Sequence, residues 1–169
     1  MPDNMLATGA LEKGQYLSFR IGDDDYAVDI LRVQEIRGWE KVRELPDSRD
    51  YVKGVLDMRG TIVPIIDLRI RFGDSDPEYS TTTVVIVVAV DREDGQRQLV
   101  GTVVDSVSDV LDVDMDNMKA PPKIGRSGGN RQYLKGMVSL ERGMVVLLDL
   151  DSLFDSIDLD DLIDGEAGV

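Results

Sequence analysis

The side chains in this sequence that could do acid–base or metal chemistry are almost all carboxylates. The chain contains no cysteine and no histidine, which excludes disulfides, thiolate zinc sites, Cys or His nucleophiles and the commonest general base. Asp67 and Asp149 each end an apolar segment, and two carboxylates can in principle serve as an acid–base pair. Because both stand at matching places of an internal repeat, capping of a following helix is the favoured interpretation.

An acidic stretch resembles a calcium-binding loop but fails on its spacing. Asp112, Asp114 and Asp116 fit the first three ligand positions of such a loop. Asn117 stands where the loop needs glycine, and Lys123 stands where it needs the bidentate glutamate. The sequence therefore predicts no calcium site here.

A glycine-rich stretch at residues 125–129 lacks the Lys-Ser/Thr pair of a phosphate-binding P-loop and the strand-to-helix context of a dinucleotide site. With no nucleophile, phosphate motif or metal-ligand set, we expect no catalytic residues, no cofactor and no metal. The expected class is a binding protein, not an enzyme.

The charge of the chain limits its partners. The 169 residues include 33 acidic and 19 basic side chains, which gives a formal net charge of -14. Such a protein repels phosphate backbones and anionic lipids, so neither a nucleic acid nor a membrane surface is an expected partner. The first 14 residues do not resemble a secretory signal, and the longest apolar run, 84–90, is too short to span a bilayer. We therefore expect a cytoplasmic protein.

Short apolar segments separated by turn residues predict a mainly β fold. One helical turn at 30–33 is expected to be capped by Asp29, another short helix is expected near residues 48–52, and the spacing of apolar residues over 151–163 predicts a C-terminal amphipathic helix. Residues 1–14 and 164–169 are expected to be flexible tails. The predicted strands are 15–21, 26–28, 34–37, 54–58, 61–67, 81–90 and 97–104.

The sequence contains an internal repeat. Residues 53–68 match residues 135–150 at a constant offset, 135 − 53 = 82, and upstream Ile30 matches Val104 at 104 − 30 = 74. We predict two related β units, 15–82 and 83–157, which pack face to face and share one core within a single domain. The segment 84–88 is apolar at every position, as expected of a strand covered on both sides.

Arg59 is the most interesting surface candidate. It stands in a tight turn beside Gly60, while Glu141 holds the matching place in the second unit, so the fold itself does not require a cation. A rigidly held arginine is a good anchor for a protein partner. A solvated turn residue, or an ion pair with Asp57, is an equally weighted alternative.

Three blocks of the sequence resemble the CheW family of chemotaxis coupling proteins. They are DDYAVDILRVQEIRG at 24–38, KGV at 53–55 with RGTIVPIIDLR at 59–69, and VG at 100–101 with VVDSVSDV at 103–110. The family commonly has Asn-Leu before the Arg-Gly turn, where this chain has Asp57-Met58. This departure alters the charge near Arg59 and leaves the expected fold unchanged.

The resemblance implies two intertwined five-stranded SH3-like barrels with a few short helices. It also implies a non-enzymatic adaptor that joins the regulatory domain of a CheA-type histidine kinase to the helical hairpin tip of a chemoreceptor. By the same resemblance the protein is a monomer in isolation and assembles in receptor arrays at the membrane without inserting into it. A CheV-like or kinase-derived module is the alternative, and the end of the chain at Val169 favours a free-standing adaptor.

The resemblance also implies which residues meet each partner. The residues implied on the receptor side are Val33, Glu35, Ile36 and Arg59, with the two apolar residues as the floor of a groove and the two charged residues as anchors. Those implied on the kinase side are Val42 and Gly54, with Lys119 and Ile124 at a second kinase contact.

Overall fold

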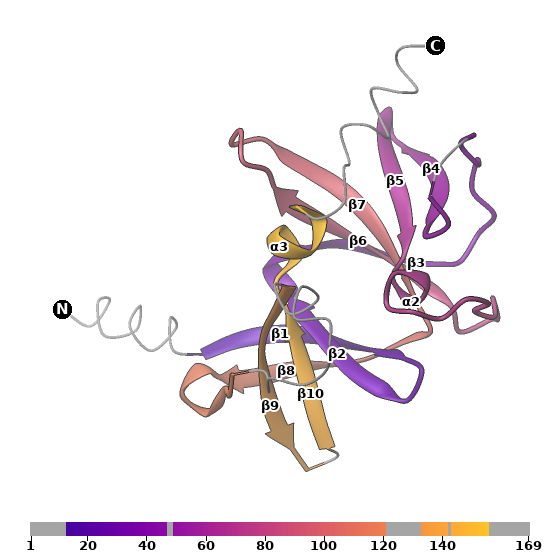
Figure 1. Ribbon diagram of the computed structural model, residues 1–169. Helices are drawn as coiled ribbons and strands as arrows, with labels where there is room; N and C mark the ends of the chain where they lie inside the picture. The colour runs from indigo at the N-terminus through magenta and orange to yellow at the C-terminus, as the bar shows by residue number, and fades with distance from the viewer. Residues whose placement is uncertain (1–12, 47–48, 121–132, 142, 156–169) are drawn as a thin grey trace.

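The computed structural model describes residues 13–46, 49–120, 133–141 and 143–155, and within them the chain forms two five-stranded sheets (Figure 1). The strands are β1 Lys13–Ile21, β2 Asp24–Asp29, β3 Val33–Gly38, β4 Val52–Met58, β5 Thr61–Asp67, β6 Val84–Asp91, β7 Arg97–Val104, β8 Ser106–Asp114, β9 Leu134–Leu140 and β10 Gly143–Leu148. The helices are η1 Ile30–Arg32, α2 Leu68–Arg71, η2 Met115–Asn117 and α3 Leu150–Asp155. None of these helices is long and apolar enough to cross a membrane.

The two sheets have the same strand order when the two repeats are exchanged. One sheet has the order β8-β1-β2-β10-β9, and the other has the order β3-β6-β7-β5-β4. Replacing β1–β5 by β6–β10, and the reverse, converts one order into the other. Each sheet therefore takes two strands from one repeat and three from the other, which confirms the predicted intertwined architecture. We call the first sheet barrel A and the second barrel B.

A backbone bridge at the far end of each sheet closes it toward a barrel. In barrel B, Arg43 follows β3 and exchanges backbone hydrogen bonds with Val55 of β4, the opposite edge strand. In barrel A, Lys119 follows β8 and exchanges them with Met137 of β9. The repeat thus extends to the closure of the barrels.

The core consists of one cluster that both barrels share and one smaller cluster in each barrel. The shared cluster combines residues of β1 and β2 with residues of β5, β6 and β7 and with Leu153 and Phe154 of α3, which lies between the two sheets in Figure 1. Along β6, Ile86 and Val88 join the shared cluster, while Val85 and Val87 join the cluster of barrel B. The expectation that this strand is covered on both sides is confirmed.

The short helices confirm some predictions and correct others. Asp29 caps η1 by accepting a hydrogen bond from the Leu31 N–H, and α3 begins the predicted C-terminal helix, whose residues after 155 lie outside the described ones. The helix predicted near 48–52 is wrong. The Val52 N–H closes a turn onto the Arg49 carbonyl, and Val52 begins β4, where its backbone pairs with Ile66 and its side chain is buried. β1 also begins at Lys13, inside the predicted tail.

Candidate functional site

Arg59 and Gly60 form the two-residue turn between β4 and β5. Their φ angles are 53° and 90°, and positive values at both positions are typical of a type I′ hairpin turn. The Asp57 side chain stabilises this turn by accepting a hydrogen bond of 2.8 Å from the Gly60 N–H. Asp57 is thus engaged with the backbone of the turn.

The Arg59 side chain pairs with Glu35 of β3. Its Nη2 atom lies 3.6 Å from Glu35 Oε1, although 87% of the Arg59 side chain is exposed. Arg37 approaches the other carboxylate oxygen of Glu35, also at 3.6 Å. That oxygen, Oε2, is buried and accepts no hydrogen bond from the described residues. Because exposed ion pairs contribute little to stability, this arrangement leaves Arg59 available to a partner.

A bulge in β3 decides which side chains share a face. The pairing with β6 shifts between Val33 and Glu35, so that Val33 lies opposite Val88, Glu35 opposite Val87 and Ile36 opposite Ile86. Directly opposed residues point to the same face of a sheet. Val33 and Ile36 therefore point to the face of the shared core, and Glu35 points to the other face. Val33 packs against that core, whereas 45% of Ile36 is exposed.

Exposed apolar side chains occur at matching places in both barrels. Ile36 and Ile62 of barrel B correspond to Val110 and Met144 of barrel A, since 110 − 36 = 74 and 144 − 62 = 82. All four are large hydrophobic residues with 40% or more of their surface exposed. In the adjoining turn, Arg59 of barrel B corresponds to Glu141 of barrel A at the same offset of 82. Sequence reasoning overlooked Val110 and Met144, which the repeat offsets alone could have identified.

Gly54 and Val42 lie together where barrel B closes. Gly54 is buried with φ 146°, and a Cβ atom there would lie 2.0 Å from the Arg43 carbonyl oxygen. Val42 packs against the core of barrel B. Gly54 is thus required by the close approach of two backbone segments. The segment it approaches, at Arg43, directly follows Val42, the other residue predicted on the kinase side.

Lys119 occupies, at the closure of barrel A, the position that Arg43 has in barrel B. A Cβ atom on Gly136, which corresponds to Gly54, would lie 3.0 Å from the Lys119 carbonyl oxygen and 2.4 Å from Met118 Cγ. Lys119 therefore corresponds to Arg43, and Met118, which sequence reasoning missed, corresponds to Val42. Lys119 is exposed, and Ile124 lies outside the described residues.

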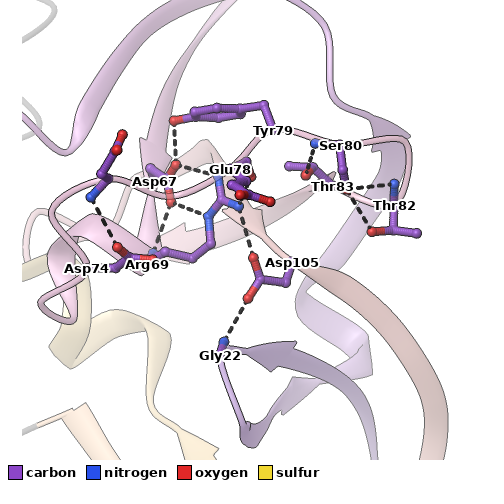
Figure 2. Close-up of polar contacts among 11 residues, drawn as sticks. Gly22, Asp67, Arg69, Asp74, Glu78, Tyr79, Ser80, Thr82, Thr83 and Asp105 are labelled. Atoms are coloured by element: carbon purple, nitrogen blue, oxygen red, sulfur yellow. Dashed lines mark hydrogen bonds and ion pairs between the residues drawn. The ribbon is translucent and has the colours of Figure 1, made fainter.

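A buried polar network lies at the junction of the two barrels (Figure 2). The Arg69 guanidinium donates to both oxygens of Asp67, to Asp105 Oδ1 at 2.9 Å and to the Glu78 carbonyl. Tyr79 covers the ion pair: its hydroxyl donates to Asp67 at 2.6 Å and its ring lies 4.7 Å from the guanidinium. Asp67 and Arg69 are almost fully buried, so the network is structural and does not present a reactive group.

The pKa shifts in this network favour its present charges. Burial on its own would lower the pKa of Arg69, but hydrogen bonds and charge attraction from Asp67 and Asp105 outweigh it and raise the pKa. Burial, followed by the hydrogen bond to Asp67, raises the pKa of Tyr79 well above its ordinary value. Arg69 therefore remains a cation and Tyr79 a neutral donor at physiological pH.

The carboxylates that could have formed an acid–base pair act as helix caps. Asp67 accepts a hydrogen bond from the Arg69 N–H at the start of α2, and Asp149 accepts one from the Ser152 N–H at the start of α3. This confirms the capping interpretation. Among the described residues no group of three or more His, Cys, Asp or Glu side chains is arranged to hold a metal ion.

Comparisons with known proteins agree with this geometry. The family model for a CheW-like domain matches residues 15–158. The chain is 41% identical to the chemotaxis protein CheW of Klebsiella aerogenes, over 84% of this chain and 82% of the relative, and 37% identical to a probable chemotaxis protein CheW of Rhizobium etli, over 88% and 93%.

A solved structure supports the same assignment. The crystal structure of the scaffolding protein TtCheW from Thermoanaerobacter tengcongensis superposes with a TM-score of 0.71 at 25% identity, covering 84% of this chain and 92% of that protein. The two five-stranded barrels, the repeat and the sequence matches thus lead to one conclusion: the chain belongs to the CheW family of chemotaxis proteins.

Proposed function

We propose that this protein is a non-enzymatic chemotaxis adaptor that couples a CheA-type histidine kinase to the hairpin tips of chemoreceptors. It binds the regulatory domain of the kinase on one side and the receptor on another, so that receptor state controls kinase activity. The protein works in the cytoplasm and is recruited to receptor arrays at the membrane through these contacts. Val33, Glu35, Ile36 and Arg59 are the proposed receptor-binding residues.

The observation that carries the receptor proposal is the combination of exposed apolar and charged groups on barrel B. Ile36 and Ile62 remain exposed although both belong to strands, and the exposed Arg59 side chain comes from the turn before Ile62. Helical partners bind apolar grooves that carry a few charged anchors. The Arg59 guanidinium can leave its long contact with Glu35 at little cost and bind a carboxylate of the partner.

The proposed kinase contacts are supported by the repeat. Val42 and Gly54 lie at the closure of barrel B, and Lys119 lies at the matching closure of barrel A. Two surfaces of related geometry allow one molecule to contact two kinase domains, as assembly into rings requires. Ile124 completes the proposed second contact.

Reconstitution tests the proposal. Purified kinase, receptor fragments and this protein are mixed, and the rate of kinase phosphorylation is measured. We expect receptor-dependent activity only when this protein is present, and Arg59→Glu to abolish that dependence while kinase pull-down is retained. Arg49→Glu, a reversal at another exposed arginine, is the matched control. Equal kinase activity with and without this protein would refute the proposal.

A further inference from the structure

The two short α-helices stand at matching places of the repeat but carry opposite charges. α2 and α3 begin at Leu68 and Leu150, and each follows a strand and a capping aspartate. The second residue is Arg69 in α2 and Asp151 in α3, with the repeat offset 151 − 69 = 82. Each of these side chains reaches a segment where the chain crosses from one barrel to the other.

The first contact, which we call the Arg69 clamp, uses a carboxylate from the crossover. Asp105 lies between β7 of barrel B and β8 of barrel A. Its Oδ1 accepts from Arg69 at 2.9 Å, and its Oδ2 accepts from the Gly22 N–H at 2.7 Å, at the end of β1 (Figure 2). Its own N–H donates to the Arg20 carbonyl. Asp105 thus joins a helix of barrel B to a strand end of barrel A.

The second contact, which we call the Arg32 clamp, uses a guanidinium from the crossover. Arg32 lies in η1, between β2 of barrel A and β3 of barrel B. It makes a bidentate ion pair with Asp151, 2.9 Å for each hydrogen bond, and donates to the Ala89 carbonyl of β6. Asp151 Oδ1 also accepts from the Asp91 N–H at 2.9 Å. A helix that follows barrel A is thus joined to a strand end of barrel B.

The two clamps bind equivalent backbone groups, but the acidic and the basic side chain exchange places between the crossover and the helix. The N–H groups belong to Gly22 and Asp91, with 91 − 22 = 69, and the carbonyls belong to Arg20 and Ala89, with 89 − 20 = 69. In each clamp the carboxylate binds the N–H of the strand end. That carboxylate comes from the crossover in the Arg69 clamp and from the helix in the Arg32 clamp.

We propose that these two clamps set the angle between the barrels, and that Arg32 and Asp151 are positioning residues for the groove that the receptor enters. The second part rests on the proposed function. Each clamp ties a crossover and a short helix to a strand end of the opposite barrel, so rotation of one barrel against the other breaks charge-assisted hydrogen bonds at both crossovers.

The Arg32 clamp is the adjustable one of the two. In the Arg69 clamp the guanidinium is 1% exposed and lies beneath Tyr79, although Asp105 is 39% exposed; in the Arg32 clamp both side chains are partly exposed, Arg32 at 24% and Asp151 at 33%. A cavity of about 210 Å³, lined by Asp29, Arg32, Lys135, Leu148, Asp149, Leu150 and Asp151, lies beside the Arg32 clamp and gives its side chains room to rearrange. Salt screens exposed charges more than buried ones, so raised salt loosens the Arg32 clamp first.

Distance measurements between the barrels test the proposal in the full chain. The protein has no native cysteine, so spin labels can be attached to cysteines introduced at Thr61 in barrel B and Glu141 in barrel A, both exposed. Double electron–electron resonance should give one narrow distance distribution for the otherwise unchanged protein. Arg32→Ala should broaden it, and more so at high salt. Arg49→Ala, at an exposed arginine outside both clamps, should leave it narrow.

A charge exchange separates the clamp from general destabilisation. Arg32→Asp combined with Asp151→Arg gives the charge order that the Arg69 clamp already has, except that Asp91, which lies 3.3 Å from Arg32, stands where the Arg69 clamp has Gly22. The double variant should therefore recover much of the narrow distribution that each single variant loses. We expect receptor-tip affinity to fall about fivefold in Arg32→Ala, at the lower end of typical coupling between sites, and to recover in the double variant. Kinase affinity should stay within about twofold.

The two proposals fail in different ways. An unchanged distance distribution in Arg32→Ala, or singles and double equally broadened, would overturn the clamp regardless of receptor binding. A changed distribution with unchanged receptor affinity would keep the clamp and overturn its role at the groove. No receptor binding by the unmodified protein would count against the proposed function and leave the distance result valid.

Discussion

Arg59 combines backbone strain with solvent exposure. It is the non-glycine residue with positive φ among the described residues, a conformation that costs an L-residue roughly 1–2 kcal/mol. Its side chain gains only a long contact with Glu35 in return. The hairpin turn requires this positive φ but not an arginine, since Gly, Asn or Asp adopts it more readily. The presence of arginine at a strained position therefore favours the anchor interpretation of Arg59 over the solvated turn residue.

Replacing Arg59 by glycine separates binding from stability. Arg59→Gly relieves the backbone strain, so the free energy of unfolding should stay unchanged or rise by about 1 kcal/mol. Receptor affinity should still fall about thirtyfold, roughly 2 kcal/mol, because the anchor is lost. Arg59→Glu should lower it further by adding repulsion. Denaturant titration measures the free energy of unfolding, and a binding assay measures receptor affinity. Wild-type receptor affinity in either folded variant would show that Arg59 is a solvated turn residue and not an anchor.

Gly54 supports the proposed kinase face through its backbone. A residue larger than glycine at this position would not leave the fold intact. The 2.0 Å approach of an added Cβ to the Arg43 carbonyl shows that the closing segment would have to move. We expect Gly54→Ala to destabilise the protein by about 3 kcal/mol, from overpacking in addition to the strained φ, and to weaken kinase binding by displacing Val42.

Gly95→Ala is the matched control for this prediction. Gly95 also has a positive φ, 84°, but nothing lies within 4 Å of an added Cβ. Its cost should therefore be that of backbone strain alone, about 1–2 kcal/mol, without any effect on kinase binding. Equal destabilisation of the two variants in denaturant titrations would show that the contact with Arg43 contributes nothing.

Among the elements, most strands could be predicted, but β8, Ser106–Asp114, was not, and neither were the irregularities of the strands. Alternation and the 82-residue offset identify β4, β5, β9 and β10 because they reflect side-chain burial directly. The bulge in β3 stayed hidden because an extra residue interrupts the alternation without changing composition. The clamps were missed for another reason: Arg69 and Asp151 have opposite charges, so a search for similar residues at the repeat offset passes over them.

The Tyr79 hydroxyl is one of the groups that hold the loop after α2, beside the hydrogen bond from Arg69 to the Glu78 carbonyl. Tyr79→Phe removes the donor to the buried Asp67 carboxylate but keeps the ring, which contacts the Trp39 ring in a tilted arrangement with the centroids 4.6 Å apart. Because Tyr79 is partly exposed, we expect a loss of only about 1 kcal/mol in the free energy of unfolding near neutral pH. Tyr51→Phe, in a half-buried tyrosine on the turn before β4, is the control and should change it less.

The same variant changes the alkaline limb of the stability curve. The pKa of Tyr79 is raised in the folded state, so the folded protein keeps a proton that the unfolded chain releases near pH 10. The stabilisation is fully present below about pH 10 and is lost as the pH rises toward the folded pKa. Wild type should therefore lose stability more steeply above pH 10 than Tyr79→Phe; parallel curves would contradict the hydrogen bond.

The whole molecule is built from two halves that complete each other. β1 and β2 of the first repeat pair with β8 and β10 of the second, while β3 and β5 pair with β6 and β7. The repeat was visible in the sequence, but the exchange of strands between barrels was not, because it depends on long-range pairing that a local pattern does not encode. The resemblance to the CheW family supplied that part of the prediction.

This arrangement predicts that neither half folds alone. A fragment of residues 1–82 keeps the β1–β2 and β4–β5 pairs but loses the strands that join them, and residues 83–169 lose their partners in the same way. The shared core takes side chains from both halves, so each fragment would expose it to water. We expect circular dichroism to show each fragment unfolded, and an equimolar mixture to regain β structure and a cooperative thermal transition. A fragment that melts cooperatively by itself would mean that one repeat can close its own barrel, which would contradict the exchange of strands as the basis of the fold.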